Sequence, residues 1–87
     1  MYRLTEKGRI AALLDKLDKE HMDASLTEGE HLLLSLLTYN ELRSRGRQMA
    51  LSDLRGGYNL HRRWWDADEE FSGAFPRMIS EGYIEDV

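Results

Sequence analysis

The strongest hydrophobic pattern of the chain begins at Thr27. Residues 27–30 match a capping box, in which Thr27 and Glu30 satisfy each other's unpaired backbone donors at the start of a helix. Leucine then occupies nearly all sides of the helix, and a helix that is apolar on more than one face is expected at the centre of a core. Its apolar positions are Leu32, Leu33, Leu34, Leu36, Leu37, Tyr39 and Leu42. We expect it to end between Arg43 and Gly46, where Gly46 can supply a left-handed cap.

A second helical pattern runs from about Glu6 to Glu20. Thr5 is a favourable N-cap, and the apolar residues after it recur at helical spacing, at Ile10, Leu13, Leu14 and Leu17. The simpler interpretation is that this stripe packs on the core of its own domain. The alternative is that it pairs with the same helix of a second copy, which would make the protein a homodimer through this helix.

The next apolar positions predict a short helix. Met49, Leu51 and Leu54 fit a helical period within residues 48–55, and the pair Gly56-Gly57 should end it. Residues 58–65 show no clean period, so we expect a connection from Gly56 to Trp65. It would be longer than the three or four residues of an ordinary helix-turn-helix turn.

The last helical pattern covers about residues 67–81. Asp66 or Asp68 can cap its start, and two glutamates follow in the first turn. Pro76 lies inside the pattern and removes a backbone donor, so we expect a kink or two helical pieces joined at Phe75. Gly82 suits the position just after the helix. The predicted buried stripe consists of Phe71, Ala74, Phe75, Met78 and Ile79.

Both ends of the chain contain strand-like strings. They are Glu81-Gly82-Tyr83-Ile84-Glu85 and Tyr2-Arg3-Leu4-Thr5-Glu6-Lys7-Gly8-Arg9. Together they resemble the two strands of the wing in winged-helix regulators of the MarR and PadR types, where such strings follow one another. In this chain they lie at opposite termini.

The resemblance implies an α+β fold. It would be a single winged-helix-like domain over residues 1–87, with about four helices and a two-stranded antiparallel sheet formed by the N- and C-terminal strands. The strand Tyr2-Arg3-Leu4 would pair with Tyr83-Ile84-Glu85. The short helix around Ser52 would be the positioning helix, and the helix over residues 67–81 would occupy the recognition place.

Charge is distributed unevenly along the chain. The formal net charge is −4, but residues 43–63 contain 6 basic residues and 1 acidic residue, whereas both flanks are acidic. A basic stretch is where a polyanion would bind. We therefore expect a non-enzymatic DNA-binding transcriptional regulator or accessory protein of the winged-helix type, with double-stranded DNA as its partner. Its phosphate contacts would come from Arg43, Arg45, Arg47, Arg55, Arg62 and Arg63.

Two tryptophans directly follow the last of these arginines. In a DNA complex, Trp64 would stack on a base or wedge at the edge of a groove. The simpler interpretation is that Trp64 or Trp65 fills the core, because large side chains are scarce in this chain. Arg62 and Arg63 would then lie in a solvated loop, and both interpretations of these arginines stay open at this point.

The helix in the recognition place begins with the wrong charge for DNA. Four carboxylates, on Asp66, Asp68, Glu69 and Glu70, lie at its start, where DNA-reading helices usually present polar or basic side chains. A phosphate backbone would repel them. The competing hypothesis is a winged-helix protein-interaction module that docks this acidic helix on a basic protein partner and binds no DNA.

Other chemistry has little support in the sequence. There is no cysteine, and His21, His31 and His61 lack the spacing of a metal site. No motif of a catalytic nucleophile or of a phosphate-binding loop is found, so we expect no enzyme, no cofactor and no metal. The apolar runs are too short to span a bilayer, and no signal peptide precedes them. We expect a cytoplasmic protein without a membrane partner.

Overall fold

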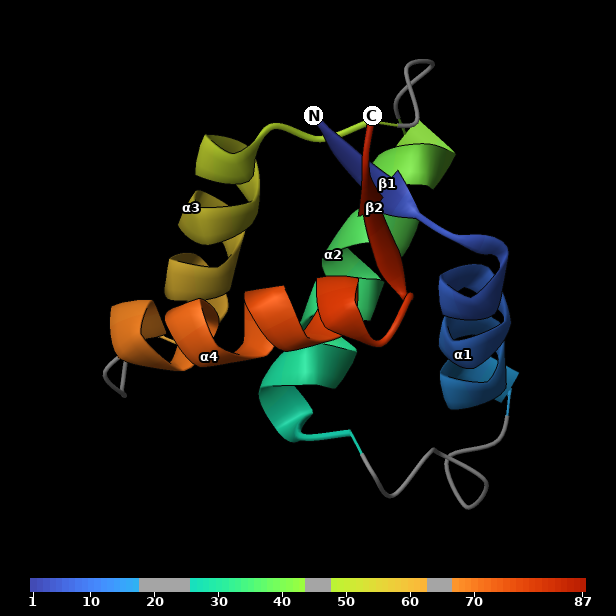
Figure 1. The fold of residues 1–87 in the computed structure, drawn as a ribbon, viewed down its shortest axis with the longest axis horizontal. Coiled ribbons are helices and arrows are strands. Elements are labelled where there is room, and N and C mark those ends of the chain that lie inside the picture. Colours follow the sequence, from blue (N-terminus) through green and yellow to red (C-terminus); the bar gives the residue numbers. More distant parts are fainter. Residues whose placement is uncertain (18–25, 44–47, 63–66) are drawn as a thin grey trace.

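The computed structural model of the chain describes residues 1–17, 26–43, 48–62 and 67–87. In Figure 1, α2 runs through the middle, α1 and α3 lie on either side of it, and α4 crosses it. The described residues form four helices and a two-stranded antiparallel sheet made by the two terminal strands, which confirms the predicted α+β class. The elements are β1 (Tyr2–Leu4), α1 (Glu6–Leu17), α2 (Glu28–Arg43), α3 (Leu51–His61), α4 (Ala67–Ser80) and β2 (Ile84–Asp86).

The two terminal strands pair as the sequence predicts. β2 begins at Ile84, one residue later than expected. The carbonyl of Tyr83 still accepts a hydrogen bond from the backbone N–H of Thr5, the residue that follows β1. The backbone N–H of Val87 donates to the carbonyl of Met1 at 2.9 Å, so the two chain ends lie beside each other. The register joins Tyr2 to Asp86, Arg3 to Glu85 and Leu4 to Ile84.

The other edge of β1 is paired as well. Tyr2 and Met49 exchange two backbone hydrogen bonds of 2.8 Å, which form an antiparallel bridge. Met49 lies between α2 and α3, so three segments far apart in sequence meet side by side, with β1 in the middle. This third segment could not be predicted from the sequence, because a single bridging residue has no alternating pattern to detect.

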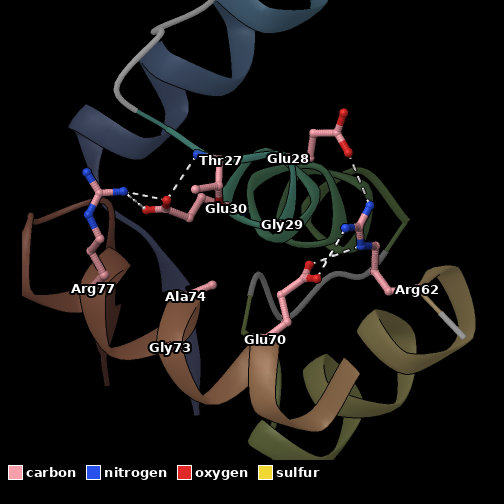
Figure 2. Close-up of a pocket in the computed structure, with 9 residues that line it drawn as sticks. All are labelled: Thr27, Glu28, Gly29, Glu30, Arg62, Glu70, Gly73, Ala74 and Arg77. Carbon is pink, nitrogen blue, oxygen red and sulfur yellow. Dashed lines mark hydrogen bonds and ion pairs between the residues drawn. The ribbon is translucent and has the colours of Figure 1, made fainter. Parts of the chain in front are cut away.

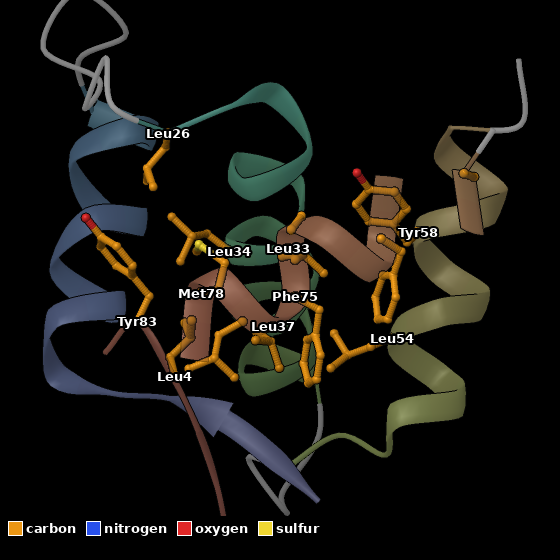
Figure 3. Packing of buried hydrophobic residues seen from close by; sticks show 14 residues of the cluster. Leu4, Leu26, Leu33, Leu34, Leu37, Leu54, Tyr58, Phe75, Met78 and Tyr83 are labelled. Atoms are coloured by element: carbon orange, nitrogen blue, oxygen red, sulfur yellow. The ribbon is translucent and has the colours of Figure 1, made fainter. Parts of the chain in front are cut away.

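Helix α2 is the centre of the core. Leu33, Leu34 and Leu37 are fully buried, and α1, α3, α4 and β1 all contact this helix. Figure 3 shows these leucines between residues of the terminal strands on one side and of α3 on the other. The expectation that this helix is covered on more than one face is confirmed. Two of its apolar positions, Tyr39 and Leu42, are nevertheless 57% and 72% exposed at the C-terminal end of the helix.

The capping box at the start of α2 is confirmed. The backbone N–H of Glu30 donates to the Thr27 hydroxyl at 3.2 Å, and the backbone N–H of Thr27 donates to the Glu30 carboxylate at 3.0 Å. These two bonds satisfy two of the donors that a helix leaves unpaired at its N-terminus. The predicted cap at Gly46 lies outside the described residues.

Helix α3 is longer than the sequence predicts. Gly56 and Gly57 do not end it; it continues to His61 and carries Tyr58 into the core, where this residue is fully buried. Glycine weakens a helix by about 1 kcal/mol relative to alanine. A Cβ on Gly57 would lie 3.1 Å from Leu36 of α2, so the glycine lets the two helices approach closely, and packing outweighs propensity. The stretch of chain between the end of α3 and the start of α4 is therefore shorter than expected.

Helix α4 is continuous, so the prediction of two pieces joined at Phe75 is wrong. Pro76 leaves the carbonyl of Ser72 without its helical donor, and Ser72 is exposed, so water can reach that carbonyl. The helix ends as expected, with Gly82 at φ 80°. The hydrogen bonds from Gly82 to Ile79 and from Tyr83 to Met78 make a Schellman cap that turns the chain into β2.

Helix α1 faces the core with its small residues. Ala11 and Ala12 pack against the buried cluster, whereas Ile10, Leu13 and Leu14 are 54%, 55% and 47% exposed. The expectation that these three pack on their own core is therefore wrong. The reason lies at Gly8, where an added Cβ would collide with the Tyr83 carbonyl, so α1 approaches the sheet along its small-residue side. Residues 18–20 of the predicted helix lie outside the described residues.

Candidate functional site

A pocket of about 640 Å³ opens between the start of α2, the middle of α4 and the end of α3. Figure 2 shows Arg62 and Arg77 on opposite sides of it, each beside glutamates, with small residues between them. Its lining consists of Thr27, Glu28, Gly29, Glu30, Arg62, Glu70, Gly73, Ala74 and Arg77. Two guanidinium groups and three carboxylates make this a surface of paired opposite charges.

On one side of the pocket, Arg77 binds Glu30. The Glu30 side chain is only 1% exposed, and both of its carboxylate oxygens accept hydrogen bonds from Arg77. One of them also accepts the backbone N–H of Thr27. A buried carboxylate is tolerated when it has a cation and hydrogen-bond donors. The pair therefore ties the start of α2 to α4.

On the other side, Arg62 holds a second cluster of carboxylates. Its guanidinium donates to Glu70 at 3.0 and 3.2 Å and to Glu28 at 3.3 Å, and the Tyr58 hydroxyl donates to the same Glu70 carboxylate. The hydrogen bond from Tyr58, followed by those from Arg62, lowers the pKa of Glu70. Burial and the Glu70 carboxylate raise the pKa of Tyr58, and the bond to Glu70 raises that of Arg62. Glu70, Tyr58 and Arg62 are therefore each held in their usual charge state.

The three predicted phosphate-contacting arginines that the structure describes are not gathered in one place. Arg43 ends α2, Arg55 lies in the middle of α3, and Arg62 follows the end of α3. In Figure 1 the end of α2 lies at the upper right, whereas α3 ends on the left, beside the start of α4. Arg45, Arg47, Arg63 and Trp64 lie outside the described residues.

These three arginines also have partners within the chain. Arg43 donates to the Tyr39 hydroxyl at 2.7 Å and lies over its ring, Arg55 lies over the Phe71 ring at 5.3 Å, and Arg62 binds its two glutamates. The remaining described arginines form ion pairs: Arg3 with Glu85, Arg9 with Glu41, and Arg77 with Glu30. Each arginine in the described part of the chain thus has an acceptor or an aromatic ring beside it.

The acidic residues at the start of α4 divide into two kinds. Glu70 belongs to the Arg62 cluster and is half-buried, whereas Asp68 and Glu69 are exposed. Asp68 accepts a hydrogen bond from the Asn59 amide at 3.1 Å. Across the described ranges, no ion pair involves Asp68 or Glu69. Asp66 lies outside the described residues. The N-terminal turn of α4 thus presents net negative charge to solvent.

A second, more apolar groove lies along α2. Its volume is about 440 Å³, and its lining consists of Leu32, Ser35, Leu36, Tyr39 and His61. Sequence reasoning missed this groove, because the leucines of α2 were all expected in the core. The sequence contains one signal for this groove: Ser35, the single serine among the leucines, lies on the side of the helix that faces solvent.

In the part of the chain that the structure covers, no three histidine, aspartate or glutamate side chains are placed to hold a metal ion. None of the described helices is both long enough and apolar enough to cross a membrane.

Comparison of the chain with family models, with curated proteins and with solved structures finds no match in any of the three.

Proposed function

We propose that this chain is a winged-helix-type domain with its wing strands at opposite termini. The support is the three-segment sheet, in which the bridge at Met49 precedes α3 and the strand after α4 pairs with β1. In this interpretation α3 is the positioning helix and α4 occupies the recognition place. Joining Val87 to Met1 would turn the two terminal strands into an ordinary hairpin wing.

The function that the geometry supports best is protein binding without enzymatic activity. One observation carries it: Asp68 and Glu69 are exposed at the start of α4, while the described arginines are engaged by acceptors or rings inside the domain. Direct DNA contact by this helix would bring these two carboxylates to the phosphates and would be repulsive. A partner with a basic surface would meet complementary charge.

The test is a pair of titrations on the folded chain. A synthetic lysine-rich peptide and a random-sequence DNA duplex are each titrated at about 50 and 200 mM salt, the range over which phosphate contacts lose affinity most steeply. We expect the peptide to bind and the duplex not to bind. The variant Asp68→Asn/Glu69→Gln should lose peptide binding, whereas the matched variant Glu81→Gln should keep it.

DNA binding is the second candidate, and Arg43 is the observation that favours it. Its exposed guanidinium uses one nitrogen for Tyr39 and lies next in sequence to a segment with two further arginines, residues 44–47. Duplex binding that falls steeply with salt and weakens in Arg43→Ala would establish this candidate and overturn the first.

A further inference from the structure

The groove on α2 belongs to a stripe of side chains whose positions are spaced symmetrically along the helix. Glu28, Leu32, Ser35, Leu36, Tyr39 and Arg43 fall within about 100° of arc on a helix of 3.6 residues per turn, so they share one face. The middle four line the groove, while Glu28 and Arg43 lie at its two ends and are both exposed. The stripe is about 22 Å long at the rise of an α-helix.

The spacing of these positions is the same counted from either end, and the two tips carry opposite charges. Glu28 and Arg43 are equally far in sequence from the midpoint between Ser35 and Leu36. Leu32 and Tyr39 are also equally far from that midpoint. An antiparallel copy of α2, placed across a two-fold axis at the midpoint, would therefore put Glu28 against the other copy's Arg43, and Leu32 against its Tyr39.

Each contact of such a pair has suitable chemistry. Ser35 is small and exposed, so it leaves room for Leu36 of the second copy at the axis. Tyr39 is 57% exposed and offers a large apolar ring. Arg43 donates one bond to Tyr39, and a guanidinium has five N–H donors, so others can reach a carboxylate. Glu28 accepts one bond from Arg62 and keeps acceptor capacity.

We propose that this stripe is a homodimer interface, in which α2 of one copy packs antiparallel on α2 of a second copy. The occupant of the groove is thus the chain itself, selected by apolar contact at the centre and opposite charges at both tips. An interface of this kind is isologous and closes at two copies. The inference does not depend on the proposed function, since it uses a different face of the domain.

The experiment is a charge swap followed by analytical ultracentrifugation of the whole chain. In Glu28→Lys the introduced lysine faces Arg43 of the partner copy, and in Arg43→Glu two carboxylates face each other, at both tips in each case. We expect each single variant to weaken dimerisation by about tenfold or more, because like charges across an interface suppress pairing. An equimolar mixture of the two variants should dimerise again, because opposite charges meet at both tips of the mixed dimer.

Two further variants separate this interface from the alternative through α1. Tyr39→Ala should weaken the dimer, whereas Leu13→Gln on the exposed stripe of α1 should leave it intact. Circular dichroism checks that each variant is folded. A wild-type chain that stays monomeric at millimolar concentration overturns the proposal, and so does a mixture of the charge variants that shows no recovery. Loss of the dimer in Leu13→Gln alone would assign it to α1 instead.

Discussion

The hydroxyl of Tyr58 donates a hydrogen bond to the Glu70 carboxylate, and the backbone of α2 passes directly beside this bond at Gly29. A Cβ on Gly29 would collide with the Tyr58 hydroxyl and would lie 2.7 Å from a Glu70 oxygen. Three helices thus meet at a point where only a glycine leaves enough space. The Arg62 cluster and the close approach of α2 to α4 both depend on it.

The first prediction concerns this contact. Gly29→Ala should destabilise the fold by about 1 to 3 kcal/mol, as for overpacking in a filled core, although alanine is the better helix former. Gly73→Ala is the matched control, because an added methyl there meets nothing within 4 Å. It should stabilise the fold by about 0.5 to 1 kcal/mol. Urea unfolding of both variants measures the difference; equal effects would show that the contact at Gly29 is not tight.

The second prediction is a pH dependence. Because the pKa of Glu70 is lowered in the folded chain, its charged form stabilises the fold above the unfolded pKa of about 4.3. This contribution is lost as the pH falls through the folded pKa. The wild-type chain should therefore lose more free energy of unfolding between pH 7 and pH 3 than Glu70→Gln does. Glu69→Gln, which changes an exposed neighbour, should follow the wild-type curve; a Glu70→Gln curve parallel to the wild type would contradict the assignment.

The third prediction concerns the buried carboxylate of Glu30. Arg77→Leu removes its cation and should cost about 1 to 3 kcal/mol or more, the penalty for leaving a buried polar group without its partner. Arg9→Leu removes a cation from the exposed pair with Glu41 and should change stability by less than about 1 kcal/mol. Thermal unfolding of the two variants at neutral pH tests the contrast. Similar melting temperatures would argue against a stabilising role for the Arg77 pair.

The fourth prediction concerns the turn from α4 into β2. Gly82 has a left-handed backbone with open space around its Cα, so Gly82→Ala should cost about 1 to 2 kcal/mol through backbone strain alone. Gly56→Ala in α3 also meets no neighbour but has no left-handed φ, and it should be neutral or stabilising. Denaturant titration separates the two; a neutral Gly82→Ala would mean that the turn relaxes.

Local signals in the sequence predicted the starts of α1 and α2 and the end of α4. The capping box at Thr27, the N-cap at Thr5 and the glycine at Gly82 each act within one turn of helix, and each is present in the structure. Strand pairing of the two termini was also predicted, because the strings that resemble a wing mark both strands. The caps depend on neighbours in sequence, whereas the pairing of the termini joins distant residues and was predicted from the resemblance alone.

The sequence predictions are wrong where residues far apart in the chain determine the local structure. Gly57 is helical because Leu36 packs against it. Ile10 is exposed because α1 contacts Tyr83 through the side of the helix that carries Gly8, and Ile10 lies on a different side. Periodicity shows that a residue is apolar on one face of a helix, but it does not show which face the rest of the chain covers. The Arg62 cluster was missed for the same reason: its members Glu28 and Glu70 come from helices far apart in sequence.

The adjacent chain ends give the sheet a mechanical property. Met1 and Val87 lie at the same end of an antiparallel pair, so tension applied between them would open the hydrogen bonds one after another from that end. Strands loaded in this way unzip, whereas strands pulled from opposite ends must break all their bonds together. A pulling experiment through the termini should therefore release β1 and β2 at low force, while the helical core around Leu33 and Leu34 still holds.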